Sequence, residues 1–231
     1  MTYGEAEGHE IENPLAKQLP STEPDDCSPS FFQRGGEIDI KHNRLPHWQQ
    51  GDVWCFVTWR LGDSLPAALL RQWRQEKDAW LKHNPRPWGV ATEREYYGIF
   101  MERIDGWLDK GMGSCLLRDS SNAEIVAGAL RHFDGERCDV ASFVVMPNHV
   151  HVLFRPLGEY KLRAILQSWK GFTAREINKR MNRKGALWQE DYWDRLVRSD
   201  HHFEYYFGYI KENPNRAGLK PGEFIYLEKD N

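Results

Sequence analysis

The sequence predicts an α+β fold: a βαββαβ core, an antiparallel sheet with helices on one face, and one further helix at the C-terminal end. Runs of β-branched and aromatic residues mark strands over residues 53–61, 138–146 and 149–154. Apolar residues recur at helical spacing between these runs and after them. The resulting order of strands and helices is typical of a sheet covered by its crossover helices.

The first predicted strand, residues 53–61, is β-branched and aromatic throughout. Asp63 or Ser64 is a suitable N-cap for the helix that follows, and the Asn84-Pro85 pair ends that helix. The buried face of this helix is predicted from apolar residues at helical spacing, namely Leu65, Leu69, Leu70, Trp73, Trp80 and Leu81.

Two further helices, between about residues 92 and 133, are predicted to enlarge the first crossover. Thr92 and Ser121 are each followed three residues later by a glutamate, which is the spacing of a capping box. The first of these helices ends at Gly111, a favourable C-cap residue, and the second reaches residue 133. Residues 138–146 and 149–154 then form an antiparallel strand pair.

By composition, the chain of 231 residues divides into an N-terminal tail, one folded domain and a short C-terminal tail. Residues 1–50 are polar and acidic with little hydrophobic periodicity, so we expect them to be disordered or loosely docked. Phe31 and Phe32 are the candidates for a docking contact. Residues 51–221 form the predicted domain, and residues 222–231 form a tail to which the sequence assigns no role.

Charge is unevenly distributed although the net charge is only −3. Residues 1–30 carry seven acids against one lysine, whereas residues 161–198 carry ten bases against four acids. The basic half is a candidate surface for phosphate groups, with a solvated helix face as the plain alternative. The ten bases are Lys161, Arg163, Lys170, Arg175, Lys179, Arg180, Arg183, Lys184, Arg195 and Arg198.

A long basic helix that ends near Met181 is predicted from an apolar face made of Leu162, Ile165, Leu166, Trp169 and Phe172. Trp188 and Tyr192 follow this basic helix near a glycine-containing turn. Aromatic side chains next to bases can stack on unpaired nucleobases, and core packing is the alternative. These two residues are the preferred candidates for stacking.

The four cysteines show no C-x-x-C spacing, which fits a reducing compartment and argues against a zinc site made of cysteines. No stretch reaches transmembrane length, and the N-terminal stretch is acidic, unlike a signal peptide. We therefore expect a cytoplasmic protein.

Two histidines face the same way on the strand predicted over residues 149–154. Side chains alternate along a strand, so His149 and His151 share one face while Val150 and Val152 point to the other. Two imidazoles at this spacing can hold one divalent ion. The alternative is the polar, solvent-facing side of a half-buried strand.

A helix is predicted after Ser199 or Asp200, either of which is a good N-cap. Tyr209 lies about 120° from the centre of the apolar stripe of this helix, and Asn213 follows one turn later on the same face. Pro214 disfavours helical geometry at the preceding residue, so Asn213 is placed at the helix end at best. A tyrosine on a half-exposed helix face is the structural alternative. The apolar stripe consists of Phe203, Tyr206, Phe207 and Ile210.

Three segments occur in order: PNHVHVLF at residues 147–154, LWQEDYWDR at 187–195 and YIKENPNRAGL at 209–219. Together they resemble the REP-associated tyrosine transposases, a branch of the single-tyrosine His-hydrophobe-His (HUH) transposases. The resemblance runs from about residue 53 to residue 219. It implies a ferredoxin-like fold with the tyrosine helix appended. It also implies metal-dependent cleavage and rejoining of single-stranded DNA through a 5′-phosphotyrosine intermediate.

By this resemblance Tyr209 is the nucleophile, and His149, His151 and Asn213 are the metal ligands. An amide oxygen is a weaker ligand than a carboxylate, which suits labile Mg²⁺ or Mn²⁺. Tyr205, on the same general side of the helix, is the rival nucleophile. The implied partner is single-stranded or hairpin DNA of the REP type, and the chain is expected to be a monomer or a homodimer.

Three alternatives remain open at the level of sequence. The first is a DNA-binding protein with little or no cleavage activity, which a nicking assay distinguishes. The second is a metal-dependent phosphoesterase, although a histidine-triad hydrolase would need a third histidine at position 153, where Leu153 stands. The third is a plain α+β binding module.

Overall fold

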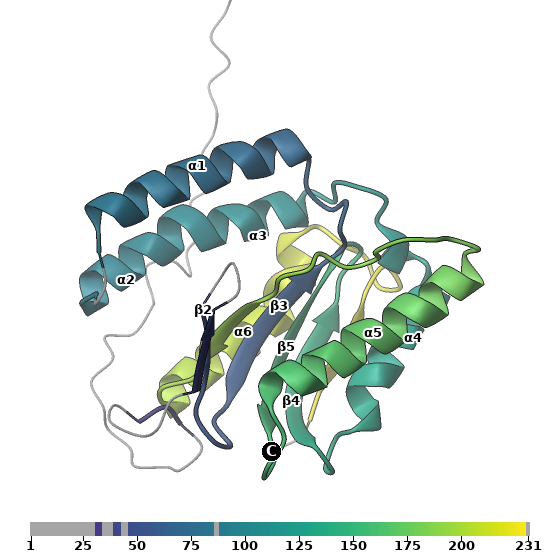
Figure 1. Cartoon of the computed structure of the whole chain (residues 1–231). Coiled ribbons are helices and arrows are strands. Elements are labelled where there is room, and N and C mark those ends of the chain that lie inside the picture. Colours follow the sequence, from purple (N-terminus) through teal and green to yellow (C-terminus); the bar gives the residue numbers. More distant parts are fainter. Residues whose placement is uncertain (1–30, 34–38, 43–45, 86–87, 230–231) are drawn as a thin grey trace, which may run out of the picture.

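The computed structural model describes residues 31–33, 39–42, 46–85 and 88–229 (Figure 1). Its centre is a five-stranded antiparallel sheet with the strand order β6-β3-β5-β4-β7. Within this sheet, the first four strands along the chain (β3, β4, β5 and β6) have the arrangement of a ferredoxin-like βαββαβ sheet. The predicted fold class is therefore confirmed. The strands are β3 (Cys55–Arg60), β4 (Cys138–Val145), β5 (His149–Pro156), β6 (Trp193–Leu196) and β7 (Ile225–Glu228).

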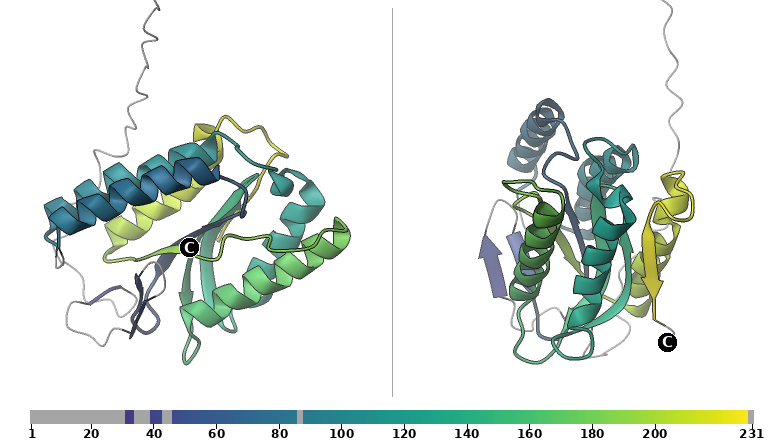
Figure 2. Two further views of the ribbon diagram at one scale, coloured as in Figure 1. Left: turned by 45° about the horizontal axis from the view of Figure 1, so that its top comes forward. Right: turned by 90° about the vertical axis from the view of Figure 1, so that its right-hand side faces the viewer.

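Helices cover both faces of this sheet (Figure 2). The crossover helices α4 (Ser120–His132) and α5 (Leu162–Arg180) pack on the face that holds Val150 and Val152. The appended helix α6 (Asp200–Arg216) packs on the opposite face. Because side chains alternate along β5, this second face is the one to which His149 and His151 point.

Helix α6 continues through Pro214. The proline lacks an N–H and so removes one bond of the helix ladder, but only two helical residues follow it. Gly218 then has φ +66°, and the N–H of Leu219 donates to the Pro214 carbonyl at 2.9 Å, which is the pattern of a Schellman cap. Asn213 therefore lies within the helix, and its predicted place at the helix end is wrong.

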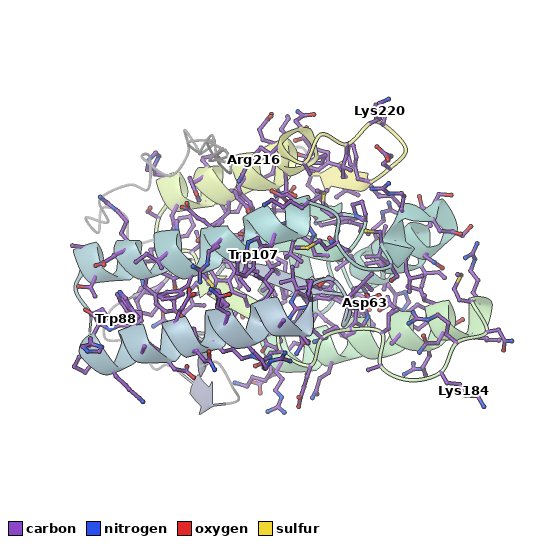
Figure 3. All side chains as sticks on the ribbon, turned by 90° about the horizontal axis from the view of Figure 1, so that it is seen from above. Asp63, Trp88, Trp107, Lys184, Arg216 and Lys220 are labelled. Atoms are coloured by element: carbon purple, nitrogen blue, oxygen red, sulfur yellow. The ribbon has the colours of Figure 1, made fainter. Side chains whose placement is uncertain are left out.

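Three helical segments precede α4 in the crossover between β3 and β4. Helix α3 lies between α1 and α6 (Figure 3), where Trp107 marks α3 and Arg216 marks the end of α6. Aromatic residues of α1 and of the segment around the π-helical turn at residues 97–101 form a separate hydrophobic cluster. Across the described helices, none combines the length and apolarity needed to cross a bilayer. The segments are α1 (Ala67–His83), α2 (Val90–Tyr96) with the π-helical turn Tyr97–Met101, and α3 (Glu102–Asp109).

The predicted helix caps in this crossover are wrong in detail. Pro66 is the N-cap of α1, while the carboxylate of Asp63 instead accepts a hydrogen bond from the N–H of Ser114 at 3.1 Å. Helix α2 begins before Thr92. Asp119 caps α4 in place of the predicted serine, accepting from the N–H groups of the second and third helical residues at 2.9 and 3.3 Å. Local sequence signatures identify residues that can cap a helix, and tertiary packing determines which of them does so.

An N-terminal hairpin, which composition did not predict, joins β1 (Asp39–His42) to β2 (Pro46–Gln49). Upstream of it, Phe31 is 6% exposed and the N–H of Phe32 donates to a backbone carbonyl next to β6 at 2.9 Å. The docking contact expected of these two phenylalanines is thus confirmed. The acidic residues 1–30 lie outside the described residues, and the proposed domain boundaries stay a prediction.

Candidate active site

His149 and His151 lie in the middle of the sheet, on the face that α6 covers. They are 1% and 0% exposed, so the alternative of a solvent-facing strand does not hold. Their Nε2 atoms are 3.0 Å apart and their ring planes meet at 81°. The alternation of β5 thus brings both imidazoles to one point.

Hydrogen bonds determine which nitrogen of each ring is free. His149 Nδ1 lies 2.7 Å from Asn148 Oδ1, and the Asn148 amide nitrogen donates to two backbone carbonyls, at the end of α3 and just beyond it, at 3.1 Å each. Because an amide oxygen only accepts, we assign the His149 proton to Nδ1. His151 Nδ1 lies 2.7 Å from the hydroxyl oxygen of Thr58, which can accept in the same way. With both protons on the Nδ1 atoms, the lone pairs of the two Nε2 atoms point to one place, as the binding of a metal ion requires.

Burial keeps both imidazoles neutral. It lowers the pKa of His149 to about 3, against the effect of the nearby Asn213 carboxamide. Burial also lowers the pKa of His151 well below its ordinary value, with His149 and Arg216 adding to the effect. A neutral imidazole nitrogen is the form that binds metal.

Asn213 faces this pair from α6. It is fully buried, and neither polar atom of its carboxamide has a hydrogen-bond partner of standard geometry in the described structure. Burying an amide without a hydrogen-bond partner costs free energy, so the oxygen of Asn213 is available to bind a metal ion. Two nitrogens bound to one ion at about 2.1 Å and at a right angle are about 3.0 Å apart, close to the separation found here.

At this point of the described structure, His149, His151 and Asn213 could together hold a metal ion. Among the described residues, no cluster of three or more histidine, cysteine, aspartate or glutamate side chains has a metal-binding arrangement. The third donor beside His149 and His151 is an amide, and two imidazoles with one neutral oxygen fit a labile divalent ion.

Tyr209 lies between the histidine pair and α3. Its ring meets the His151 ring edge-on, with centroids 5.4 Å apart and planes at 84°. Its hydroxyl donates to Asp105 Oδ2 at 2.9 Å, and the Arg216 guanidinium lies 5.0 Å from its ring centroid. The phenol therefore has a proton acceptor and a cation within reach.

Three carboxyl groups share the face of α3 that meets α6, because Glu102, Asp105 and Asp109 follow the three- and four-residue spacing of a helix. Burial raises the pKa of all three, that of Asp105 to about 7 and that of Asp109 to about 6. Arg216 opposes each shift, and at Asp105 the hydrogen bond from Tyr209 opposes it more strongly. Asp105 is only partly buried as a residue, but its carboxyl is poised to exchange a proton near neutral pH.

The rival nucleophile, Tyr205, stacks on Tyr209 one turn earlier, with ring centroids 6.4 Å apart. The contacts with Asp105 and the histidine pair belong to Tyr209. Of the neighbouring histidines, His201 is exposed, while His202 is 2% exposed and its Nδ1 accepts from a backbone N–H at 3.2 Å. His202 thus fixes the start of α6 and lies apart from the site.

Most of the predicted DNA-binding bases lie on the other side of the sheet, because α5 covers the face opposite the histidines (Figure 2). Two of these bases already bond other groups of the protein. The Lys170 amine donates to the carbonyls of Gln189 and Glu190 at 2.8 and 2.7 Å, and Arg180 pairs with Asp119 at 3.1 Å. The exposed bases of this group are Lys161, Arg163, Arg175, Lys179, Arg183 and Lys184.

The remaining candidates lie around β6. The guanidinium of Arg195 lies 3.7 Å from the centroid of the Tyr97 ring, and that of Arg198 lies 5.8 Å from the Phe32 ring. Trp188 and Tyr192 are 6% and 8% exposed and belong to the core between the sheet and α5. In this structure neither ring offers an open face to a base.

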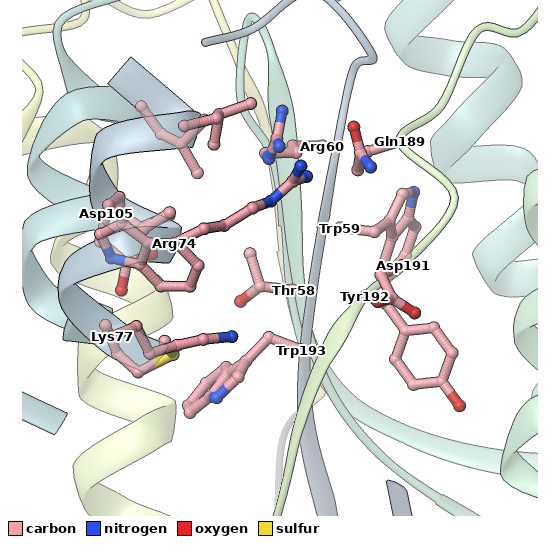
Figure 4. A pocket seen from close by; sticks show the side chains of 15 residues that line it. Thr58, Trp59, Arg60, Arg74, Lys77, Asp105, Gln189, Asp191, Tyr192 and Trp193 are labelled. Carbon is pink, nitrogen blue, oxygen red and sulfur yellow. The ribbon is translucent and has the colours of Figure 1, made fainter. Parts of the chain in front are cut away.

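Four groups beside the site were not predicted from the sequence. Asp105 bonds Tyr209, and a cleft next to it is lined by Arg60 from the end of β3 and by Arg74 and Lys77 from α1 (Figure 4). A signal was present, since α1 carries two bases three residues apart. Helical periodicity predicts which face of α1 is buried but not which element its polar face meets.

Residues 119–213 match the model of the family described as IS200-like transposases. This match confirms the resemblance to tyrosine transposases over those residues. The matched range includes His149, His151, Tyr209 and Asn213. It leaves out β3 and the helices α1 to α3.

Among solved structures, the chain is similar to a REP-associated tyrosine transposase bound to a REP hairpin. The identity is 13%, the alignment covers 78% of this chain and 76% of that one, and the TM-score is 0.43. It is also similar to a candidate transposase from Deinococcus radiodurans R1, at 14% identity over 70% of this chain and 90% of that one, with a TM-score of 0.29. Among curated proteins, none matches at a significant level.

Proposed function

We propose that the chain is a metal-dependent single-strand DNA endonuclease and strand transferase of the transposase type, with Tyr209 as nucleophile. It binds hairpin DNA of the REP type and cleaves and rejoins it through a 5′-phosphotyrosine intermediate. The observation that carries this proposal is the convergence of Tyr209 and Asn213 from α6 on the paired Nε2 atoms of His149 and His151. The IS200-like family match over the same stretch supports it.

In this proposal His149, His151 and Asn213 hold Mg²⁺ or Mn²⁺, which supplies charge stabilisation at the scissile phosphate. The neutral imidazoles, the converging lone pairs and the unpartnered amide all favour a cation at this point. Titration of Mn²⁺ into the full chain is expected to show one site that His149→Ala removes. The control His132→Ala, at an exposed position on α4, should retain it. Equal binding by both variants would contradict the ligand set.

Tyr209 and Asp105 carry the proposed chemistry. The Tyr209 oxygen forms a bond to phosphorus as the bond from phosphorus to the 3′-oxygen breaks. The phenolic proton passes to Asp105, and the departing 3′-oxygen takes a proton from water. Burial raises the pKa of Tyr209 well above its ordinary value, so an acceptor at 2.9 Å is needed to remove the proton. In the reverse step a 3′-hydroxyl attacks the phosphotyrosine, so rejoining needs no external energy.

The proposal is tested by incubating the full chain with a library of hairpin oligonucleotides and Mn²⁺ or Mg²⁺. A denaturing protein gel is expected to show a shifted covalent adduct, and sequencing the trapped DNA would identify the target. Binding without an adduct would favour a DNA-binding protein that does not cleave. Hydrolysis of small phosphodiesters without DNA binding would favour the phosphoesterase alternative.

A further inference from the structure

An open cleft beside Tyr209 is lined by cations from two elements of the fold (Figure 4). Arg60 projects from β3, and Arg74 and Lys77 project from α1. The cleft also includes Thr58 and Asp105, which bond His151 and Tyr209 respectively. It therefore shares a wall with the candidate active site.

Arg60 and Lys77 are buried, Arg74 is exposed, and all three line one cleft together with Asp191, whose carboxyl group attracts Lys77. Arg60 is 9% exposed and donates to the Ser64 hydroxyl at 2.9 Å, and the Arg74 guanidinium extends toward it (Figure 4). Lys77 is 8% exposed, with its amine 4.7 Å from the centroid of the Trp73 ring. Within the described part of the chain, none of the three forms an ion pair with a carboxylate.

Arg74 repels both of the other cations. Burial lowers the pKa of Arg60 to about 10, with Arg74 adding to the effect. Burial also lowers the pKa of Lys77, and the attraction of Asp78 and Asp191 opposes this shift. A phosphate bound among the three cations would relieve their mutual repulsion. Guanidinium groups suit this role because their planar donors match phosphate oxygens.

The lining of the cleft is also apolar and aromatic. Trp193 projects from β6 next to the amine of Lys77 (Figure 4), and its indole is only half-buried. Leu70 of α1, together with Met101 and Ile104, adds further apolar lining. Cations beside an aromatic wall are the combination that holds single-stranded nucleic acid, with phosphates on the bases of the protein and nucleobases on its rings.

We propose that this cleft binds one nucleotide of the DNA strand next to the scissile phosphate. Its phosphate lies on Arg60, Arg74 and Lys77, and its base lies against Trp193. The proposal rests on the proposed function and names a subsite of it. All three cations precede residue 119, where the family match begins, so the phosphate-binding part of the subsite comes from residues that the family model does not match, while Trp193 lies within the matched range.

The test measures binding without cleavage, in full-length chains that carry Tyr209→Phe. The probe is a fluorescent oligonucleotide hairpin with a single-stranded extension, followed by anisotropy over a range of salt concentrations. Arg74→Gln is expected to weaken binding and to reduce the slope of log K against log salt by about 0.7, the value for one phosphate contact on a single strand. The matched control is Arg71→Gln, at an exposed position on α1 outside the cleft, and it should change neither.

A second measurement locates the base. With 5-iodouracil in the extension, ultraviolet cross-linking followed by mass spectrometry is expected to map to Trp193, and Arg74→Gln should weaken this cross-link. Equal affinity and slope in the Arg74 and Arg71 variants, or cross-links that avoid Trp193, would overturn the subsite. Formation of the covalent adduct by the wild-type chain would then leave the proposed function standing. If neither the wild-type chain nor any variant bound DNA, both the subsite and the proposed function would be contradicted.

Discussion

Buried polar groups define the site at the scale of single residues. The Nε2 atoms of His149 and His151 are buried 3.0 Å apart, and the amide of Asn213 is buried without a conventional hydrogen-bond partner. Strand alternation and the four-residue step of a helix predicted that the histidines share a face and that Tyr209 lies above Asn213. Asp105 was out of reach of such patterns, because its contact with Tyr209 joins residues 104 positions apart.

Asp105→Asn is expected to slow adduct formation by Tyr209, because the amide keeps the hydrogen bond but cannot accept the proton. Loss of one general base typically lowers the rate about 10²- to 10⁴-fold. In the wild type the rate should rise as pH increases through about 7, where Asp105 loses its own proton. The rate of adduct formation measured from pH 5 to 9 tests this, with Glu136→Gln on an exposed turn as control. A pH profile left unchanged by Asp105→Asn would exclude this role.

The same carboxyl should make folding stability depend on pH. Its pKa is raised from 3.8 to about 7 in the folded state, so folding retains a proton that the unfolded chain releases. Stability from this group is therefore complete below about pH 4 and is lost as pH rises to about 7. Asp105 faces Tyr209 and Arg216 of α6 and lies between Glu102 and Asp109 on α3.

Asp105→Asn should accordingly stabilise the fold, relative to the wild type, more at pH 8 than at pH 5. We expect a gain on the order of 1 to 3 kcal/mol, allowing for the partial exposure of the residue. Urea unfolding of both chains at the two pH values measures the difference. A variant less stable than the wild type at pH 8 would contradict the shift assigned to Asp105.

At the scale of elements, the position of α3 is set by the loop that follows it. Gly113 has φ +85°, and a Cβ there would lie 2.4 Å from the carbonyl oxygen of Asp63. The loop after α3, the helix that carries Asp105, thus packs directly on the turn before α1. Strand positions followed from β-branched and aromatic runs, whereas this packing depends on tertiary contacts that no local pattern encodes.

Gly113→Ala is expected to lower the free energy of unfolding by about 1 to 3 kcal/mol, since the backbone must leave a conformation that alanine disfavours and must move away from Asp63. Gly128→Ala is the matched control, because a Cβ at that helical position on α4 meets nothing within 4 Å. This control should be neutral or up to about 1 kcal/mol stabilising. Equal urea midpoints for the two variants would contradict this prediction and show that the loop moves away from Asp63 at little cost in free energy.

At the scale of the whole molecule, two basic surfaces lie on opposite faces of the sheet. The exposed bases of α5 lie over one face, and the cleft of Arg60, Arg74 and Lys77 adjoins the site on the other (Figures 2 and 4). The basic half of the chain was evident from composition. The face it would cover was not, because a helical pattern shows which residues meet a sheet but not which side of the sheet they meet.

The double variant Arg163→Glu, Arg175→Glu is expected to weaken overall DNA binding and to flatten its salt dependence, because both bases are exposed on α5. The rate of adduct formation at saturating DNA should remain that of the wild type, since these residues lie across the sheet from Tyr209. Single-turnover kinetics at high DNA concentration measures this rate. A rate reduced as strongly as the affinity would place the scissile strand on α5 instead.

The most direct test compares Tyr209→Phe with Tyr205→Phe in the adduct assay with hairpin DNA and Mn²⁺. Each variant removes one hydroxyl from neighbouring, stacked rings on α6, so the two are matched in position and chemistry. We predict that Tyr209→Phe abolishes the covalent adduct while still binding DNA, and that Tyr205→Phe retains the adduct. An adduct that persists in Tyr209→Phe and disappears in Tyr205→Phe would contradict the assignment of Tyr209 as nucleophile.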